Sequence, residues 1–156
     1  MRLLSTPEIT AKYGKPNQSG TYLVSIPLPY PMRLAWDLKT RVNTMRCHKL
    51  VADDFKAVFH GIRKEYTLDE IKRLDIDLFG GCFNFRAMRN GTDWSRHAWG
   101  IAIDLSPEKN GLNTPWAKSQ FARPEYAPMH AAFERQGFLN LGKVWGRDVM
   151  HFEKGI

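Results

Sequence analysis

The sequence predicts one α+β domain with a small, mostly antiparallel sheet and flanking helices. Helical segments precede and separate short strand-like segments without a regular βαβ rhythm, which favours this class over a parallel α/β fold. The chain has 156 residues, the size of one ordinary domain, and it shows no internal repeat, low-complexity tract or linker. We therefore expect a single domain over residues 1–156, and a monomer because no coiled-coil pattern is present.

The first half is expected to supply two helices and one strand. Thr6-Pro7-Glu8 predicts the start of a short helix, with Thr6 as N-cap, that ends at Gly14. Residues 21–28 alternate and are rich in β-branched and aromatic side chains, which predicts a strand that prolines 27, 29 and 31 then break. Residues 48–66 repeat apolar side chains every three or four positions, which predicts an amphipathic helix.

The second half is expected to alternate short strands with shorter helices. The expected elements are a helix over 67–74, a strand over 82–88, a turn over 90–93, a strand over 99–105, a helix over 125–136 that ends at Gly137, and a strand over 149–153. Cys47 and Cys82 lie far apart without Cys-x-x-Cys spacing. They are therefore expected to be reduced and mostly buried thiols.

The charge of the chain favours an anionic partner. Lysines and arginines number 23 against 16 acidic residues, which gives a formal net charge of +7. Nucleic acid is the commonest such partner, but the bacterial envelope surface is also polyanionic. No apolar run approaches the ~20 residues that span a bilayer, and the first residues lack a signal-peptide core. We expect no signal peptide, no membrane insertion and a start in the cytosol.

Two separate strand-like segments carry side chains that suit a catalytic zinc ion. Ser95–Leu105 holds His97 and Asp104, and the last strand holds His151. Catalytic zinc often takes three such ligands and leaves its fourth position to water. Asp148, three residues before His151, is placed to serve as a general base. Spacing alone leaves a structural role for these residues open, while no serine or cysteine nucleophile motif and no phosphate-binding loop is present.

Three motifs resemble the zinc D-Ala-D-Ala metallopeptidases. SRHAWGIAID, residues 95–104, resembles the family signature Ser-x-His-x-x-Gly-x-Ala-x-Asp. DVMHFE, residues 148–153, resembles its second signature, and FGGCFNFRAMRNG is similar to its arginine-bearing strand. The resemblance covers residues 79–153, and the first half is similar to phage-encoded members in a looser way. The family includes vancomycin-resistance carboxypeptidases and dipeptidases, and phage endolysins that cut between L-alanine and D-glutamate.

The resemblance implies a hedgehog-like fold that carries one Zn²⁺ on its sheet. The implied zinc ligands are His97, Asp104 and His151. Asp148 matches the catalytic carboxylate of the family. Arg86 stands where the family has an arginine that binds the scissile carbonyl or a substrate carboxylate, with Arg89 as the alternative. Ser95, the first residue of the signature, is expected to bind substrate.

These features predict a zinc-dependent peptidoglycan peptidase, namely a phage endolysin that cleaves the L-alanyl-D-glutamate bond of the stem peptide. Aspartate rather than glutamate at position 148 favours the endolysin branch. The alternatives are a D-alanyl-D-alanine carboxypeptidase, and a non-catalytic zinc-stabilised domain that binds wall or nucleic acid. The expected partners are stem peptides and the anionic envelope surface, with no nucleic acid. The expected location is the host bacterial cytoplasm, with release to the wall through a holin pore.

Overall fold

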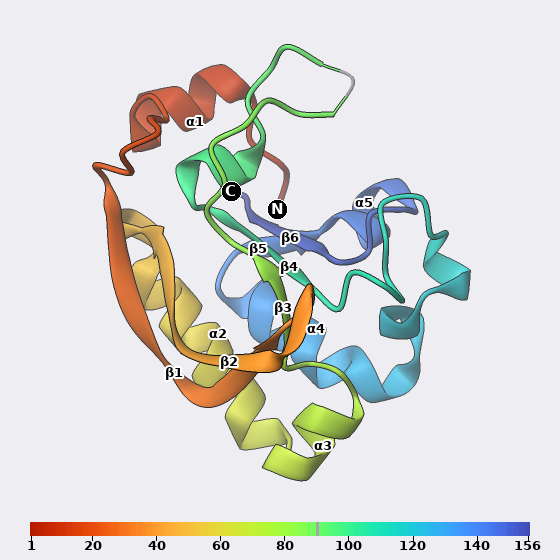
Figure 1. Ribbon diagram of the computed structural model, residues 1–156. Coiled ribbons are helices and arrows are strands. Elements are labelled where there is room, and N and C mark those ends of the chain that lie inside the picture. The colour runs from red at the N-terminus through yellow and green to blue at the C-terminus, as the bar shows by residue number, and fades with distance from the viewer. Residues whose placement is uncertain (90) are drawn as a thin grey trace.

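The computed structural model describes residues 1–89 and 91–156 (Figure 1). The α-helices are α1 (Thr6–Tyr13), α2 (Ala52–Glu65), α3 (Leu68–Arg73), α4 (Ala127–Arg135) and α5 (Leu141–Trp145). The strands are β1 (Leu23–Leu34), β2 (Asp37–His48), β3 (Leu78–Gly81), β4 (Ala102–Leu105), β5 (Phe138–Asn140) and β6 (His151–Lys154). Short 3₁₀ helices are η1 (Lys49–Val51), η2 (Arg96–Trp99), η3 (Trp116–Lys118), η4 (Gln120–Ala122) and η5 (Pro124–Tyr126).

The α+β class is confirmed, but the sheet is mixed rather than mostly antiparallel. Its six strands lie in the order β2-β1-β3-β4-β6-β5. The strand β1 pairs antiparallel with β2 and parallel with β3. The reason lies in the connection: α2 and α3 carry the chain from β2 past β1, so that β3 runs in the same direction as β1. The hedgehog-like fold and the single-domain organisation remain predictions.

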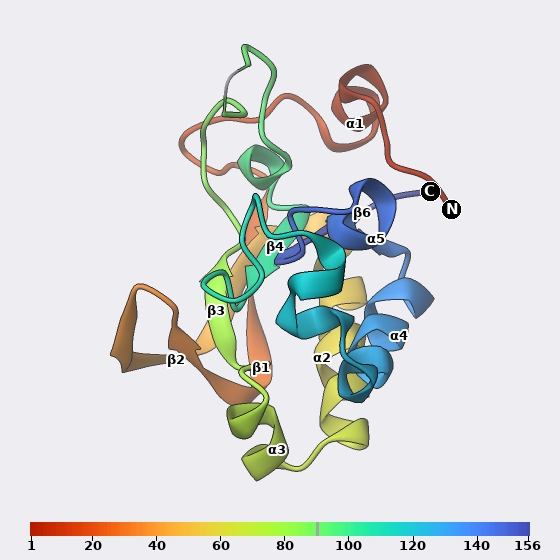
Figure 2. The same cartoon turned by 90° about the vertical axis from the view of Figure 1, so that its right-hand side faces the viewer.

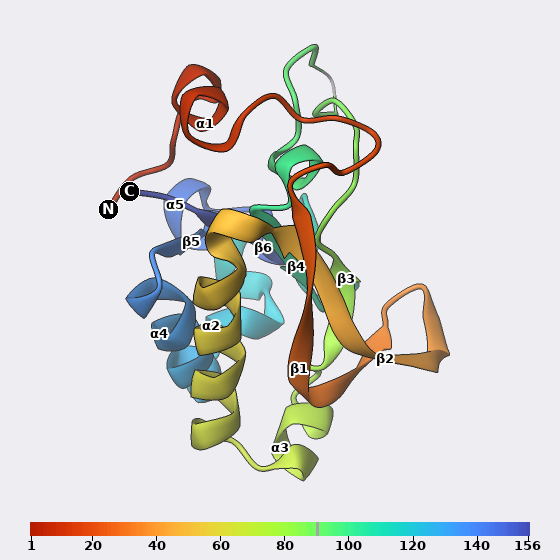
Figure 3. The same ribbon diagram turned by 90° about the vertical axis from the view of Figure 1, so that its left-hand side faces the viewer.

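The amphipathic helix expected over 48–66 is formed by η1 and α2. The side chains on its inner apolar stripe are fully buried, among them Phe55, Val58, Phe59 and Ile62. The helices α2 and α4 pack side by side against one face of the sheet (Figures 2 and 3). Phe133 of α4 stacks on Phe152 of β6 with ring centroids 4.0 Å apart. This packing holds the last strand, which carries one of the candidate ligands, firmly in the core.

The first strand continues through the prolines that were expected to break it. The register of β1 against β2 shifts between Pro27 and Met32, so Pro29 and Pro31 lie in a bulge. Proline lacks the N–H group that a regular ladder needs, and a bulge leaves residues unpaired. The unpaired stretch between Pro27 and Met32 therefore accommodates Pro29 and Pro31 within the extended chain.

The strand expected over 82–88 lies earlier in the chain, as β3, and ends at Gly81. The strand pairs with β4 at this point because Gly80 has no side chain: a Cβ atom added there would lie 3.0 Å from Cβ of Asp104 on β4. The absence of a side chain lets β3 and β4 approach closely beside a candidate ligand. The turn predicted over 90–93 includes residue 90, which lies outside the described residues.

The structure also tests the expected N-cap of the first helix, the state of the two cysteines and the search for a membrane-spanning helix. The N-cap of α1 is Ser5 rather than Thr6, and it forms a capping box with Glu8. Cys47 and Cys82 are buried and form no disulfide. Within residues 1–89 and 91–156, no helix combines the length and the apolar character that a membrane span requires.

His130 on α4 is buried as a neutral imidazole. Its Nε2–H group donates to the carbonyl oxygen of Phe121 at 2.8 Å, and its Nδ1 atom has no hydrogen-bond partner among the described residues. Burial lowers the pKa of His130 from 6.5 to about 4. The fold thus binds fewer protons here than the unfolded chain does. Its stability is complete above pH 6.5 and falls as the pH drops toward 4.

We predict that His130→Phe weakens this acid sensitivity. A pKa that moves from 6.5 to about 4 corresponds to about 3 kcal/mol. Urea unfolding with chelator present should show that the variant loses about 3 kcal/mol less than wild type between pH 7 and pH 4. Equal losses in both proteins would contradict this assignment.

Candidate metal centre

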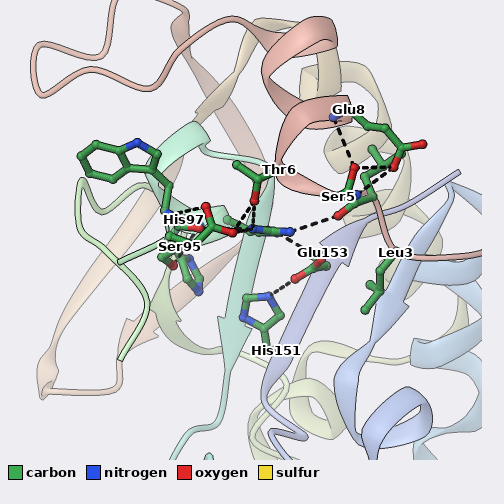
Figure 4. Close-up of polar contacts among 12 residues, drawn as sticks. Leu3, Ser5, Thr6, Glu8, Ser95, His97, His151 and Glu153 are labelled. Atoms are coloured by element: carbon green, nitrogen blue, oxygen red, sulfur yellow. Dashed lines mark hydrogen bonds and ion pairs between the residues drawn. The ribbon is translucent and has the colours of Figure 1, made fainter. Parts of the chain in front are cut away.

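The three predicted ligands meet on one face of the sheet. Asp104 on β4 lies directly opposite His151 on β6 in the antiparallel register. Side chains of directly opposed residues project to the same face, which brings these two together. His97 comes from η2, immediately before β4 (Figure 4). One ligand atom from each of the three residues lies within 4.8 Å of the others.

The geometry centres on the Asp104 carboxylate. Its Oδ2 atom lies 3.2 Å from Nε2 of His97, and its Oδ1 atom lies 3.1 Å from Nδ1 of His151. The two imidazole rings are nearly perpendicular, with centroids 4.9 Å apart. Burial acts to raise the pKa of Asp104, but both histidines outweigh burial and hold that pKa well below its usual range. The carboxylate is therefore ionised, as a metal ligand must be.

His97 is positioned by the short helix that carries it. The hydroxyl of Ser95 caps η2 by accepting a hydrogen bond from the backbone N–H of His97 at 3.3 Å. Gly100 ends η2 in the left-handed region with φ +71°, and a Cβ atom there would lie 2.9 Å from the backbone nitrogen of His48. Capping and close packing thus fix where the His97 ring can reach.

The imidazole of His97 presents a nitrogen that fits a metal ion. Its Nδ1–H group donates to the carbonyl oxygen of Cys82 at 2.7 Å. This bond leaves the Nε2 lone pair directed at the Asp104 side, and Nε2 is buried without a hydrogen-bond partner among the described residues. Metal-binding histidines characteristically donate their other N–H group to a carbonyl or carboxylate. The donor set therefore suits zinc.

Glu153 is a functional candidate that the sequence analysis missed. Its Oε2 atom lies 2.9 Å from Nε2 of His151, so Nδ1 of that ring faces the cluster. Burial acts to lower the pKa of His151, but its hydrogen bonds to Asp104 and Glu153 outweigh burial and raise that pKa to about 10. The sequence did contain one signal for Glu153: it lies two residues after His151 on the same strand, and residues two apart on a strand share a face.

Asp148 lies just ahead of β6 and closes the turn into it. Its carbonyl oxygen accepts a hydrogen bond from the backbone N–H of His151 at 3.2 Å, and its backbone has a left-handed φ of +58°. The Oδ1 atom is buried without a hydrogen-bond partner among the described residues. Burial, the largest influence, raises the pKa of Asp148. The Asp148 carboxyl group thus lines the same cleft as the cluster, and its Oδ1 atom forms no hydrogen bond with the described residues.

The cluster lies on the wall of a cleft of about 720 Å³. The cleft lining also includes Ser95, Asp148 and both candidate arginines, Arg86 and Arg89. Arg86 is half-buried and Arg89 is exposed. The structure thus brings all predicted site residues to one cleft. It also adds the N-terminal residues 2–5 to the lining, to which the sequence analysis assigned no role.

Residues 89–154 match a family model described as D-alanyl-D-alanine carboxypeptidase. The resemblance to the zinc D-Ala-D-Ala metallopeptidases is confirmed for this segment. This segment contains the three clustered candidate ligands and Asp148, whereas Arg86 precedes it. The match supports a zinc peptidoglycan peptidase in general. Comparison with curated proteins and with solved structures gives no match.

We predict that zinc stabilises the protein through this cluster. At a free zinc concentration of 100 times the Kd, the free energy of unfolding should rise by about 2.7 kcal/mol. His97→Ala should abolish that gain, because one of the three clustered ligands is lost. His60→Ala, which removes an exposed histidine of α2, should keep it. Thermal melts with zinc and with chelator measure the effect, and an equal zinc response in both variants would contradict the site.

Proposed function

We propose that the protein is a zinc-dependent peptidoglycan peptidase that serves as a phage endolysin and cleaves the L-alanyl-D-glutamate bond of the stem peptide. The observation that carries the peptidase assignment is the His97–Asp104–His151 cluster with Asp148 beside it on one cleft. Aspartate rather than glutamate at position 148 favours the endolysin branch. A purely structural metal site has no use for a free carboxyl group. Asp148 therefore favours hydrolysis over the alternative of a non-catalytic binding domain for wall or nucleic acid.

The catalytic roles follow from the chemistry of the side chains. Zinc, when bound by His97, Asp104 and His151, would supply Lewis acidity and activate water at neutral pH. Asp148 takes a proton from the attacking water and returns it to the leaving amine. Its raised pKa moves this carboxylate toward the working pH, where a general base is most effective.

Substrate binding is assigned to the arginines of the cleft. Arg86, or Arg89 in its place, stabilises the oxyanion that develops at the scissile carbonyl or binds a substrate carboxylate. Ser95 is assigned to substrate binding as well, although its hydroxyl already caps η2. Stem peptides carry several carboxylates, and the formal net charge of +7 favours approach to the anionic envelope.

The proposal extends to the cellular location, the oligomeric state and the partners of the protein. A monomer made in the host cytoplasm would reach the wall through a holin pore, without nucleic acid as a partner and without inserting into the membrane. A D-alanyl-D-alanine carboxypeptidase is the second candidate. The description of the matched family model favours this candidate, which would use the same ligands and the same base.

We predict that Asp148→Asn separates catalysis from metal binding. The amide keeps the shape but cannot take a proton, so hydrolysis of purified peptidoglycan should fall at least about 100-fold. Zinc content by atomic absorption should remain at one ion per chain. Chelator should abolish wild-type hydrolysis, and zinc should restore it. Full activity in the variant, or hydrolysis that chelator does not affect, would refute the assigned mechanism.

Product analysis decides which bond is cut. Incubation with defined muropeptides followed by mass spectrometry should yield fragments with a new N-terminal D-glutamate. Release of free D-alanine would instead support the carboxypeptidase. Intact muropeptides together with full zinc occupancy would favour the non-catalytic domain.

A further inference from the structure

Arg96 joins the metal centre to the N-terminal segment of the chain. Its side chain is only 14% exposed, and its Nε atom lies 3.8 Å from Oε1 of Glu153. On the other side, its Nη2 atom donates to the carbonyl oxygen of Leu4 at 3.0 Å, and Nη1 donates to the hydroxyl of Thr6 at 3.1 Å. A single guanidinium group therefore contacts both the acid beside His151 and the beginning of the chain.

Glu153 depends on this neighbour because its carboxylate is buried. The side chain is 5% exposed, with one oxygen bound to His151 and the other facing Arg96. Burial of a carboxylate costs several kcal/mol unless a partner compensates it. Within the described ranges, Arg96 is the only lysine or arginine that pairs with Glu153. Its guanidinium stays charged at every working pH, so the compensation is permanent.

The N-terminal segment is itself tied down, which makes it a support for Arg96. Ser5 and Glu8 form the capping box of α1, and Arg2 pairs with Glu8. The hydroxyl of Thr6 donates to the carboxylate of Asp93. Figure 4 shows Ser5 and Thr6 on the side of Glu153 that lies away from His151. The segment therefore holds Arg96 in place from the outside.

We infer that Arg96 is a positioning residue of the metal centre, which holds Glu153 against His151 and is held in turn by residues 4–6. The inference rests on the metal centre within the proposed function, and not on which bond is cut. Outer partners of a ligating histidine fix its ring orientation and its basicity. Their loss lowers metal affinity by roughly 10- to 100-fold. We expect the same scale for loss of Arg96.

The test measures zinc affinity by competition with a chromophoric chelator, and the visible spectrum of the cobalt-substituted protein. Arg96→Met keeps the aliphatic stem and removes the charge and all donors. It should weaken zinc binding at least about tenfold and alter the cobalt spectrum. Arg96→Lys retains a cation and should recover part of the affinity.

Arg33→Met is the matched control. Arg33 is 17% exposed and pairs at 2.8 Å with Asp77, a buried acid, and neither residue lines the cleft. This variant should lose stability in a melt of the metal-free protein and keep the zinc affinity and cobalt spectrum of wild type. The comparison separates general destabilisation from loss of positioning.

A double-mutant cycle with Glu153→Gln makes the test decisive. If Arg96 acts through Glu153, the double variant should lose no more zinc affinity than the weaker-binding single variant. Additive losses, or an Arg96→Met protein with wild-type affinity and spectrum, would overturn the inference. Wild-type protein that binds no zinc would overturn both the inference and the metal centre. Zinc binding with this non-additivity but without peptidoglycan hydrolysis would count against the proposed function alone.

Discussion

The site depends on the contacts of the Asp104 carboxylate with two histidines, His97 and His151. The contact with His151 forms because β4 and β6 pair in a register that sets Asp104 opposite His151. A slip by one residue would turn one of these side chains to the opposite face and disperse the cluster. The stacking of Phe133 on Phe152 fixes the same register from the helical face, because Phe152 is the residue next to His151. The packing of the core and the geometry of the site thus depend on the same strand register.

The sequence predicted the parts of the molecule that local patterns encode. The helix α2 was predictable because its apolar side chains repeat along the chain itself. The candidate ligands could be named because they lie in two segments that resemble signatures of the zinc D-Ala-D-Ala metallopeptidases, whereas their spacing alone left a structural role open. Sheet order was not, because the parallel pairing of β1 with β3 depends on a crossover that no local pattern records. The bulge that accommodates Pro29 and Pro31 is also visible only once the partner strand is known.

The residues that position the candidate ligands, Arg96 and Glu153, could not be identified from the sequence for a similar reason. Arg96 contacts Leu4 and Thr6, whose positions lie 92 and 90 residues earlier in the chain. Strand alternation places Glu153 on the same face as His151, but its role becomes visible only from the position of the His151 ring. Residues that bind a metal tend to lie in recognisable motifs, whereas the residues that orient them come from wherever the fold brings a suitable charge.

The backbone at Asp148 restricts which residues can occupy that position. A φ of +58° places it in the left-handed region, where aspartate and asparagine are found several-fold more often than other residues with side chains. Glutamate would bring a longer carboxylate and also a conformation that its backbone adopts less readily. Exchange between the two acids at this position is therefore more than a change of length. A glutamate at this position would therefore disturb the turn before the last strand as well as move the carboxyl group.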